Sequence, residues 1–160
     1  MNFVVEFYKR PDGIKPVAEF IKSLETKMKA KVVANLHLLE EYGNKAREPL
    51  SKPLGDGRRR GHMSDLQELT NELMKDPDFK REYEALQPEM DITRAILDAR
   101  IQAGLTQMQL SEKSGISQAD ISRLEKGTRN PSLSLLKRLA EAMDSTLRIE
   151  FVPKKRMGSS

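Results

Sequence analysis

Cysteine is absent from the sequence, and histidine occurs only at His37 and His62. A chain without cysteine has no disulfide framework, no thiolate metal site and no cysteine nucleophile. The two histidines lie in unlike contexts, so neither a metal site nor a bound cofactor is expected. No apolar run approaches the roughly 18–20 residues that span a bilayer. The N-terminal residues contain no apolar signal core, so the sequence predicts a cytoplasmic protein without membrane contact.

Charge is distributed unevenly along the 160 residues. Residues 1–60 carry a net charge of +5, residues 61–91 carry −6 and residues 92–160 carry +5, which sums to the +4 of the whole chain. This basic–acidic–basic order indicates three units rather than one. The last basic unit fits a polyanionic partner, and the acidic unit fits a basic protein surface. Solvated helix faces are the alternative explanation for each charge run.

The first unit predicts a strand followed by two helices. Residues 3–7 (FVVEF) are β-branched and aromatic, as in strands. Apolar residues at helical spacing predict helices over 16–24 and 26–42, and Gly43 suits the end of the second.

Glycine, proline and consecutive arginines then predict an irregular linker, which we assign to residues 58–63. His62 and Met63, followed by a fresh Ser64, resemble a cloning scar and a second translation start. Our hypothesis is a constructed fusion, and residues 157–160 also look vector-derived. An uninterrupted genomic reading frame through residues 58–63 would exclude it.

The acidic unit predicts two short helices. Residues 65–75 have an apolar side, and Asp76 can cap a helix over 77–86 that has Pro77 at its first position. We expect Pro88 to end this second helix.

Residues 92–145 carry the most specific pattern of the chain. A helix with apolar spacing from Ile92 ends at Gly104, and Thr106 can cap the next helix. Gly115 permits the left-handed conformation of a tight turn, and Ser117 can cap the helix after it. A last helix begins near residues 130–132. The core positions expected in the two middle helices and their turn are Leu110, Ile116, Ile121 and Leu124.

These residues resemble the helix-turn-helix of the lambda-repressor/Cro type, also called the XRE family. The resemblance covers about 40 residues, from LTQMQL to LAEAM, and Ser111 stands where the family usually has alanine. It implies that the helix after Gly115 enters the major groove of duplex DNA. The candidate DNA-binding residues are Gln107, Gln118, Ala119, Asp120, Ser122, Arg123, Thr128, Arg129 and Asn130.

Different roles are expected within this set. Gln118 and Arg123 have the reach for base edges, since glutamine suits adenine and arginine suits guanine. Gln107 matches the family's phosphate-contacting glutamine, and residues 128–130 match its backbone-contacting loop. Asp120 and Ser122 fit an ordinary solvent face equally well.

The alternation of apolar and polar residues over 145–152 predicts a C-terminal strand, which we assign to residues 146–153, before a tail at 154–160. A lone strand must pair with something. Pairing with its copy gives a homodimer, which a palindromic operator requires. Pairing with residues 3–7 is the alternative.

Residues 1–57 resemble the beginning of a RelE-like toxin of the HigB group, on the segments VEFYKRPDGIKPVAEFIKSL, LHLLEEYG and LSKPLGDG. The resemblance implies an α+β fold that cleaves messenger RNA on the ribosome. It stops at Gly57, before the strands that carry the family's catalytic residues. Because RNA cleavage needs a general base, a general acid and cationic support in one cleft, we assign no catalytic residue and expect no enzyme activity.

Residues from Met63 onward resemble the HigA antitoxin, the partner of that toxin. The resemblance implies binding to a cognate RelE-like toxin and repression of the operon. The acidic helical segment 64–91 is the candidate contact, and packing on the DNA-binding core is the alternative. The candidate toxin-contacting residues are Leu66, Leu69, Leu73, Phe79 and Tyr83.

Together these patterns predict a mainly α protein. It has a five-helix helix-turn-helix domain at 92–145 and a small α+β N-terminal fragment, a strand and two helices of a truncated RelE-like fold. The predicted function is a DNA-binding, toxin-neutralising antitoxin. The alternatives are a ribosome-dependent mRNA endonuclease and a toxin–antitoxin interaction module without DNA specificity.

Overall fold

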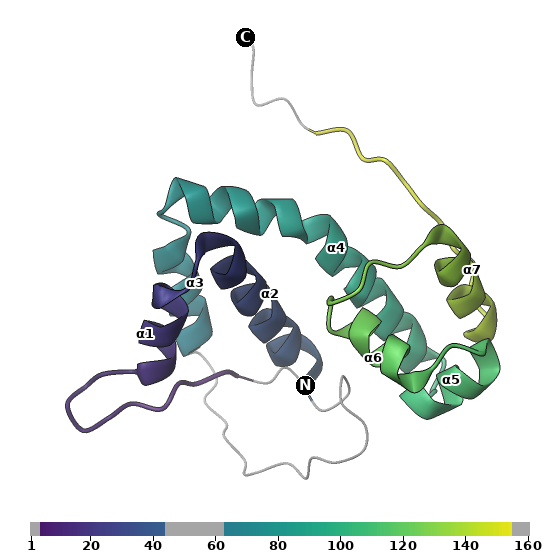
Figure 1. Ribbon diagram of the computed structural model, residues 1–160, viewed down its shortest axis with the longest axis horizontal. Helices are drawn as coiled ribbons and strands as arrows, with labels where there is room; N and C mark the ends of the chain where they lie inside the picture. Colours follow the sequence, from purple (N-terminus) through teal and green to yellow (C-terminus); the bar gives the residue numbers. More distant parts are fainter. Residues whose placement is uncertain (1–3, 44–62, 155–160) are drawn as a thin grey trace.

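The computed structural model describes residues 4–43 and 63–154, and over these residues the chain is helical and contains no strand. Figure 1 shows α1–α3 at one end, α5–α7 at the other, and α4 running between them. The predicted mainly α class is confirmed. The helices are α1 (Pro16–Ser23), α2 (Thr26–Tyr42), α3 (Asp65–Leu73), α4 (Pro77–Gln102), α5 (Gln107–Ser114), α6 (Gln118–Glu125) and α7 (Leu133–Ala142).

Helix ends follow the local chemistry of the sequence. The predicted caps Asp76, Thr106 and Ser117 each accept a backbone N–H of the first turn, which leaves one fewer unpaired donor at each end. Ser64 and Ser132 do the same for α3 and α7. These five caps explain why most breaks between helices fall where the sequence predicts them.

The predicted end of a helix at Pro88 is wrong, because α4 continues through it from Pro77 to Gln102. Proline has no N–H, so the carbonyl of Glu84 loses its helical partner, and a bend is the usual result. Figure 1 shows α4 bending along its length. Leu86 and Met90 are buried on either side of Pro88, and this tertiary burial holds the helix together.

The predicted strand at residues 3–7 does not form over its described part, residues 4–7. The backbone N–H of Val5 donates to Glu40 at 2.9 Å, and that of Phe7 donates to Asp65 at 2.8 Å. Carboxylates of α2 and α3 therefore replace the neighbouring strand that would otherwise accept these bonds. The described residues thus show no α+β fragment.

The predicted strand at 145–152 does not form within the single chain, because these residues pair with no other segment among those the structure describes. Figure 1 shows the segment after α7 leaving the body of the molecule, away from the N-terminal residues. Pairing with the described residues 4–7 is therefore not formed. Residues 92–145 contain the end of α4 and then α5, α6 and α7, four described helices rather than the predicted five.

Two hydrophobic clusters stabilise the fold, and α4 contributes to both. The first joins α1, α2 and α3 to one side of α4 from Phe79 to Leu97, with Ile21, Val33, Leu66 and Phe79 almost fully buried. The second joins the end of α4 to α5, α6 and α7. Described residues of the predicted segments 1–57 and 64–91 thus share one core. Except for Met63 and Lys154, the predicted linker (58–63) and tail (154–160) lie outside the described residues.

His37 tightens the contact between α2 and α3. Its Nε2 lies 2.8 Å from Thr70 Oγ1, and Thr70 donates to the carbonyl of Leu66. The Thr70 hydroxyl therefore accepts a hydrogen bond from the Nε2–H of the histidine ring. Burial lowers the pKa of His37, and the nearby Glu40 carboxylate opposes this effect. The ring borders an open hollow of about 530 Å³ that Arg94 and Glu41 also line, paired with each other at 3.0 Å.

Candidate nucleic-acid interface

The turn between α5 and α6 is built from side-chain caps and one glycine. Thr106 and Gln109 cap α5 reciprocally, each side chain bonding the other's backbone N–H. Gly115 then adopts φ 71°, a left-handed conformation that suits glycine. An ideal Cβ on Gly115 would lie 3.2 Å from Arg138 Nη2, which donates to the carbonyl of Ser114. The predicted left-handed turn is confirmed.

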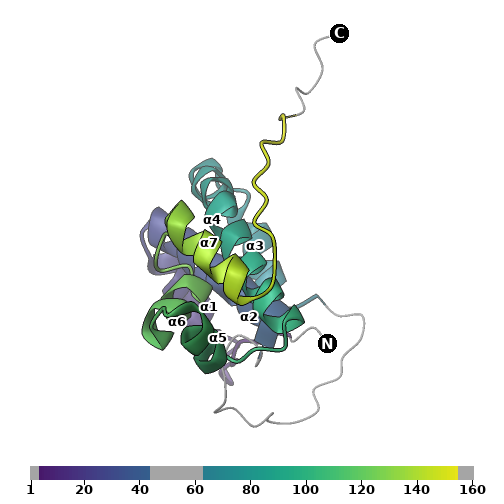
Figure 2. The same cartoon turned by 90° about the vertical axis from the view of Figure 1, so that its right-hand side faces the viewer.

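Helix α6 has one buried and one outward face. Ile121 and Leu124 are almost fully buried in the second cluster. Gln118, Ala119 and Arg123 are exposed, while Asp120 and Ser122 are partly exposed. Figure 2 shows α5, α6 and α7 grouped around the end of α4, and α6 contacts both α4 and α5. This packing fixes α6 from behind and leaves its polar face free to contact a groove.

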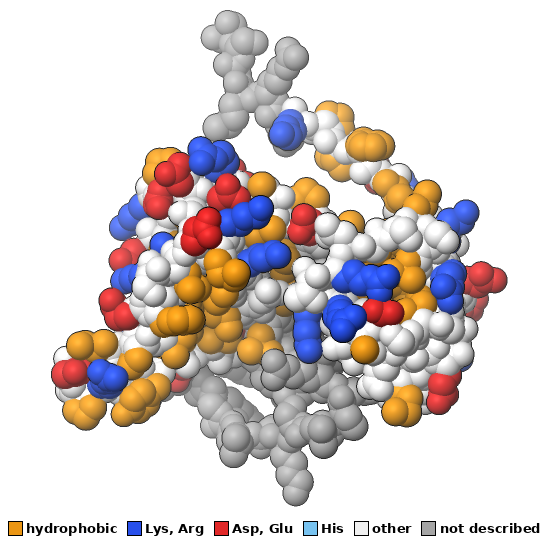
Figure 3. All heavy atoms as spheres, in the orientation of Figure 1, with side chains coloured by type: hydrophobic (Ala, Val, Ile, Leu, Met, Phe, Trp, Pro, Cys, Tyr) orange, Lys and Arg blue, Asp and Glu red, His pale blue; other side chains and the backbone are white. Residues whose placement is uncertain are grey.

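Asp120 organises the cations on this face. Its Oδ1 lies 2.5 Å from Arg129 Nη1 and 3.4 Å from Arg123 Nη1. The hydrogen bond with Ser117, then the one with Arg129, hold the pKa of Asp120 below its ordinary value. Asp120 therefore stays ionised and fixes two arginines at the outer surface. Figure 3 shows blue side chains around a red one over this region.

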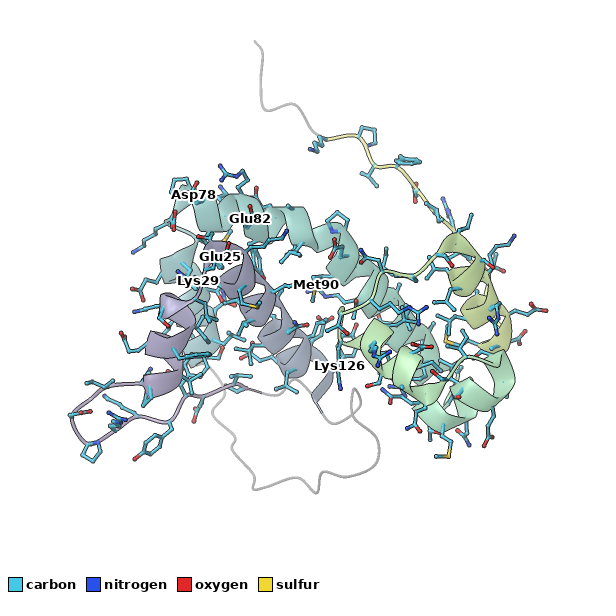
Figure 4. The ribbon with its side chains drawn as sticks, in the orientation of Figure 1. Glu25, Lys29, Asp78, Glu82, Met90 and Lys126 are labelled. Carbon is cyan, nitrogen blue, oxygen red and sulfur yellow. The ribbon has the colours of Figure 1, made fainter. Side chains whose placement is uncertain are left out.

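The loop after α6 adds a further cation, Lys126, which is exposed and labelled in Figure 4. Thr128 is fixed by a hydrogen bond from its backbone N–H to the carbonyl of Arg123 at 3.0 Å. An ideal Cβ on Gly127 would lie within 3.9 Å of Asn35, so α2 reaches the edge of this loop. The predicted loop residues 128–130 are exposed. Sequence reasoning omitted Lys126, although it stands between Glu125 and Gly127 at the end of the predicted helix.

A buried ion pair supports the site from inside. Arg100 and Glu125 are 1% and 4% exposed, and they form two hydrogen bonds, Nε–Oε1 at 2.5 Å and Nη2–Oε2 at 3.0 Å. Gln107 also donates to Glu125 Oε2, at 2.8 Å. Leu105 accepts from Arg100 through its carbonyl. The network joins α4, the start of α5 and the end of α6, so it sets the spacing of these helices.

The network bears on one sequence prediction and adds two residues that the sequence did not point out. Gln107 is 7% exposed and its amide is bonded to Glu125, so the predicted phosphate contact has to coexist with this bond. Arg100 and Glu125 were missed altogether. The sequence does hold an indication of both residues, because side chains four positions apart lie on the same face of a helix. Arg100 lies four residues after Ile96, and Glu125 lies four residues after Ile121, so each charge falls on the core side of its helix.

The five candidate toxin-contacting residues lie inside the first hydrophobic cluster. Leu66, Leu69, Leu73 and Phe79 are at most 9% exposed, and Tyr83 is partly buried and stacks on Phe79 with ring centroids 5.6 Å apart. They face the chain's own α1 and α2. Any contact with a separate protein at these side chains requires α1 and α2 to move away.

Within the described ranges, no set of three histidine, aspartate or glutamate side chains is placed to hold a metal ion. No helix there has the length and apolar character needed to cross a membrane.

Two helices joined by a capped left-handed turn, the second with an exposed polar face, define a helix-turn-helix domain. The family model described as "Helix-turn-helix" matches residues 96–149. This range begins within α4 and ends beyond α7, so it includes the whole second cluster. The class predicted for 92–145 is confirmed.

Curated relatives extend this result. Antitoxin HigA1 of Mycobacterium tuberculosis is 30% identical over 81 residues, which is 51% of this chain and 54% of the relative. An uncharacterized HTH-type transcriptional regulator, y4dL of Sinorhizobium fredii, is 41% identical over 66 residues, 41% of this chain and 33% of the relative. Another from Haemophilus influenzae is 38% identical over 58 residues, 36% of this chain and 59% of the relative. The chain spans about half the length of HigA1, and no solved structure matches it.

These similarities show that residues 96–149 resemble a helix-turn-helix domain of the kind found in an antitoxin and in transcriptional regulators. The matches do not show a RelE-like fragment in residues 1–57, so that part of the resemblance stays a prediction.

Proposed function

We propose that this protein binds duplex DNA sequence-specifically through α6 and represses its own operon. The observation that carries the proposal is the outward face of α6, where Gln118 and Arg123 are exposed while Ile121 and Leu124 anchor the helix. An α-helix held in this way fits the major groove, where every base pair presents a distinct pattern of donors and acceptors. Arg129 and Lys126 lie beside it as cations for the phosphate backbone.

The direct test is a binding titration at several salt concentrations. The probes are duplex DNA from upstream of the chain's own gene and a scrambled duplex of equal length and composition. We expect tight binding to the first only, weakening steeply with salt because bound cations release counterions from the phosphates. Equal and weak binding to both duplexes would reject sequence-specific binding.

Replacing Gln118 by alanine is expected to reduce the preference for the native duplex. A bidentate contact from glutamine to adenine contributes about 1–3 kcal/mol of discrimination, a factor of about 5 to 150. The measurement is the ratio of dissociation constants for native and scrambled duplexes. Gln102→Ala is the matched control, since Gln102 is exposed at the end of α4 and borders a hollow to which α6 contributes no residue. An unchanged ratio for Gln118→Ala would remove this side chain from base recognition.

Replacing Asp120 by asparagine is expected to strengthen binding to the scrambled duplex and to lower specificity. Without the carboxylate, Arg129 and Arg123 are released to the phosphates, and one added phosphate contact steepens the plot of log binding constant against log salt by about 0.9. The control, Glu89→Gln, removes an exposed carboxylate from α4. A salt slope equal to that of the unchanged protein would show that Asp120 does not restrain these arginines.

Neutralisation of a RelE-like toxin is the second part of the proposal, and α3 with the start of α4 is the contact region. The similarity to Antitoxin HigA1 supports it. In this chain that region is covered by α1 and α2 through a shared apolar core. The same observation favours the interaction-module alternative, in which the two parts of the chain mainly stabilise each other.

A further inference from the structure

The segment after α7 exposes large apolar side chains without a partner. Residues 145–154 are extended, and Ile149, Phe151 and Val152 are 63%, 97% and 79% exposed. Figure 3 shows orange side chains along this segment as it leaves the body. An extended backbone with free N–H and C=O groups and apolar side chains readily pairs with another strand. Within the described chain no strand is available to it.

We propose that this segment pairs antiparallel with the same segment of a second copy of the chain, with Ile149 opposite the partner's Ile149. Its alternating pattern places Leu147, Ile149 and Phe151 on one face and Arg148 and Glu150 on the other. If the two-fold axis is perpendicular to the two-stranded ribbon, the same residues of both copies lie on the same face of the ribbon. Each residue then lies opposite a partner residue whose number is also odd, or also even. One residue, the centre of the ribbon, lies opposite its own copy.

Charge selects the register among these centres. Centring on Ile149 places Arg148 opposite the partner's Glu150, and it brings Lys154 level with the partner's Asp144. Centring on Arg148 or on Glu150 opposes two like charges directly. Opposed unlike charges stabilise a strand pair and like charges destabilise it.

The registers centred two residues away, on Leu147 or on Phe151, place like charges opposite each other. A centre at Leu147 opposes Glu150 to the partner's Asp144, and a centre at Phe151 opposes Arg148 to the partner's Lys154. In the single chain Arg148 and Glu150 lie 3.6 Å apart and are largely exposed, so both are free to exchange partners. Of the five centres from 147 to 151, only Ile149 pairs unlike charges.

The apolar face fits the same arrangement. A hollow of about 760 Å³ lies between α7 and the segment, and its lining includes Leu133, Ala140, Leu147 and Ile149. In the proposed register Leu147 stands opposite the partner's Phe151, on the face that borders this hollow. The partner's Phe151 therefore enters the hollow, and the most exposed apolar side chain of each copy becomes covered by the other.

Pairing of this kind joins two helix-turn-helix domains about a two-fold axis, as two halves of a palindromic site require. This use of the dimer rests on the proposed DNA binding. The pairing itself does not, because none of its residues lies on α6.

Disulfide trapping tests the register in the full chain without DNA. The chain has no cysteine, so Ile149→Cys introduces a single thiol. Opposed residues of antiparallel strands have Cα atoms about 4.5–5.5 Å apart, within the range of a disulfide. We expect mild oxidation at micromolar concentration to convert this variant into a covalent dimer on a non-reducing gel. The matched control, Val152→Cys, lies six residues from its own copy in this register, so it stays monomeric.

Charge reversal supplies a second measurement. We expect Arg148→Glu to reduce the dimer fraction in sedimentation equilibrium several-fold, and Arg148→Glu combined with Glu150→Arg to restore it. Equal cross-linking of the two cysteine variants, absence of cross-linking at position 149, or failure of the double reversal to restore the dimer would overturn the proposed register. A chain that fails these tests and still prefers its native duplex retains the proposed DNA binding, so the two failures are distinguishable.

Discussion

Replacing Glu125 by alanine is expected to destabilise the helix-turn-helix half of the molecule by about 3–5 kcal/mol, because it leaves the guanidinium of Arg100 buried without its carboxylate. The cost is large because two elements lose their partner on α6 at once: α4 through Arg100 and the start of α5 through Gln107. Loss of DNA binding should follow, since α6 depends on this network for its position.

The measurement is urea unfolding followed by circular dichroism, with the midpoint and slope compared between variants. Glu112→Ala, at an exposed glutamate of α5, is the control and should change stability by no more than about 0.5 kcal/mol. The double variant Arg100→Met, Glu125→Leu should recover much of the loss, since apolar replacement of both partners of a buried pair is often neutral. If Glu125→Ala and Glu112→Ala unfold alike, the network does not stabilise the fold.

Replacing Phe79 by alanine is expected to cost about 3–5 kcal/mol, the usual range for removing a fully buried aromatic ring. The loss concerns the first cluster, where Phe79 joins α1, α2 and α3 to the start of α4. The second cluster does not include it. We therefore expect the variant to loosen the N-terminal half while binding of the native duplex persists.

Urea unfolding and the duplex titration of the same variant provide the check. Phe20→Ala is the matched control, because Phe20 has the same side chain but is 62% exposed on α1. Persistent DNA binding in a destabilised Phe79→Ala variant favours the DNA-binding regulator. Simultaneous loss of stability and of duplex preference would favour the interaction module, in which neither half works without the other.

Local sequence patterns accounted for most helix boundaries and for the turn at Gly115. The errors arose where tertiary contacts replace local rules. Carboxylates from α2 and α3 satisfy Val5 and Phe7 in place of a strand, and neither acid is near them in sequence. Pro88 is tolerated in α4 because burial on either side offsets the lost hydrogen bond. Neither effect can be read from a window of neighbouring residues.

For the candidate site, periodicity separated the buried side of α6 from its outward side, and Gln118 and Arg123 are exposed as that separation implies. The periodicity of apolar residues shows which face of a helix a side chain lies on, but it does not show which residue that side chain bonds to. It therefore missed that Glu125 holds Arg100 and Gln107, and that Asp120 holds Arg129. The pairs of Glu125 join residues 18 and 25 positions apart, and the packing of α4, α5 and α6 brings them together.

Helix α4 is the one element common to both clusters, and adjacent residues divide between them: Leu97 belongs to the first and Ile96 to the second. The length of an uninterrupted helix sets both the distance and the rotation between the parts of the protein that pack on its two ends. Each inserted residue would advance everything beyond it by about 1.5 Å and turn it by about 100°. The number of residues between Phe79 and Arg100 therefore sets the angle at which α6 is presented relative to α1 and α2. Changes of length that a surface loop absorbs would here turn α6 away from the direction it now faces.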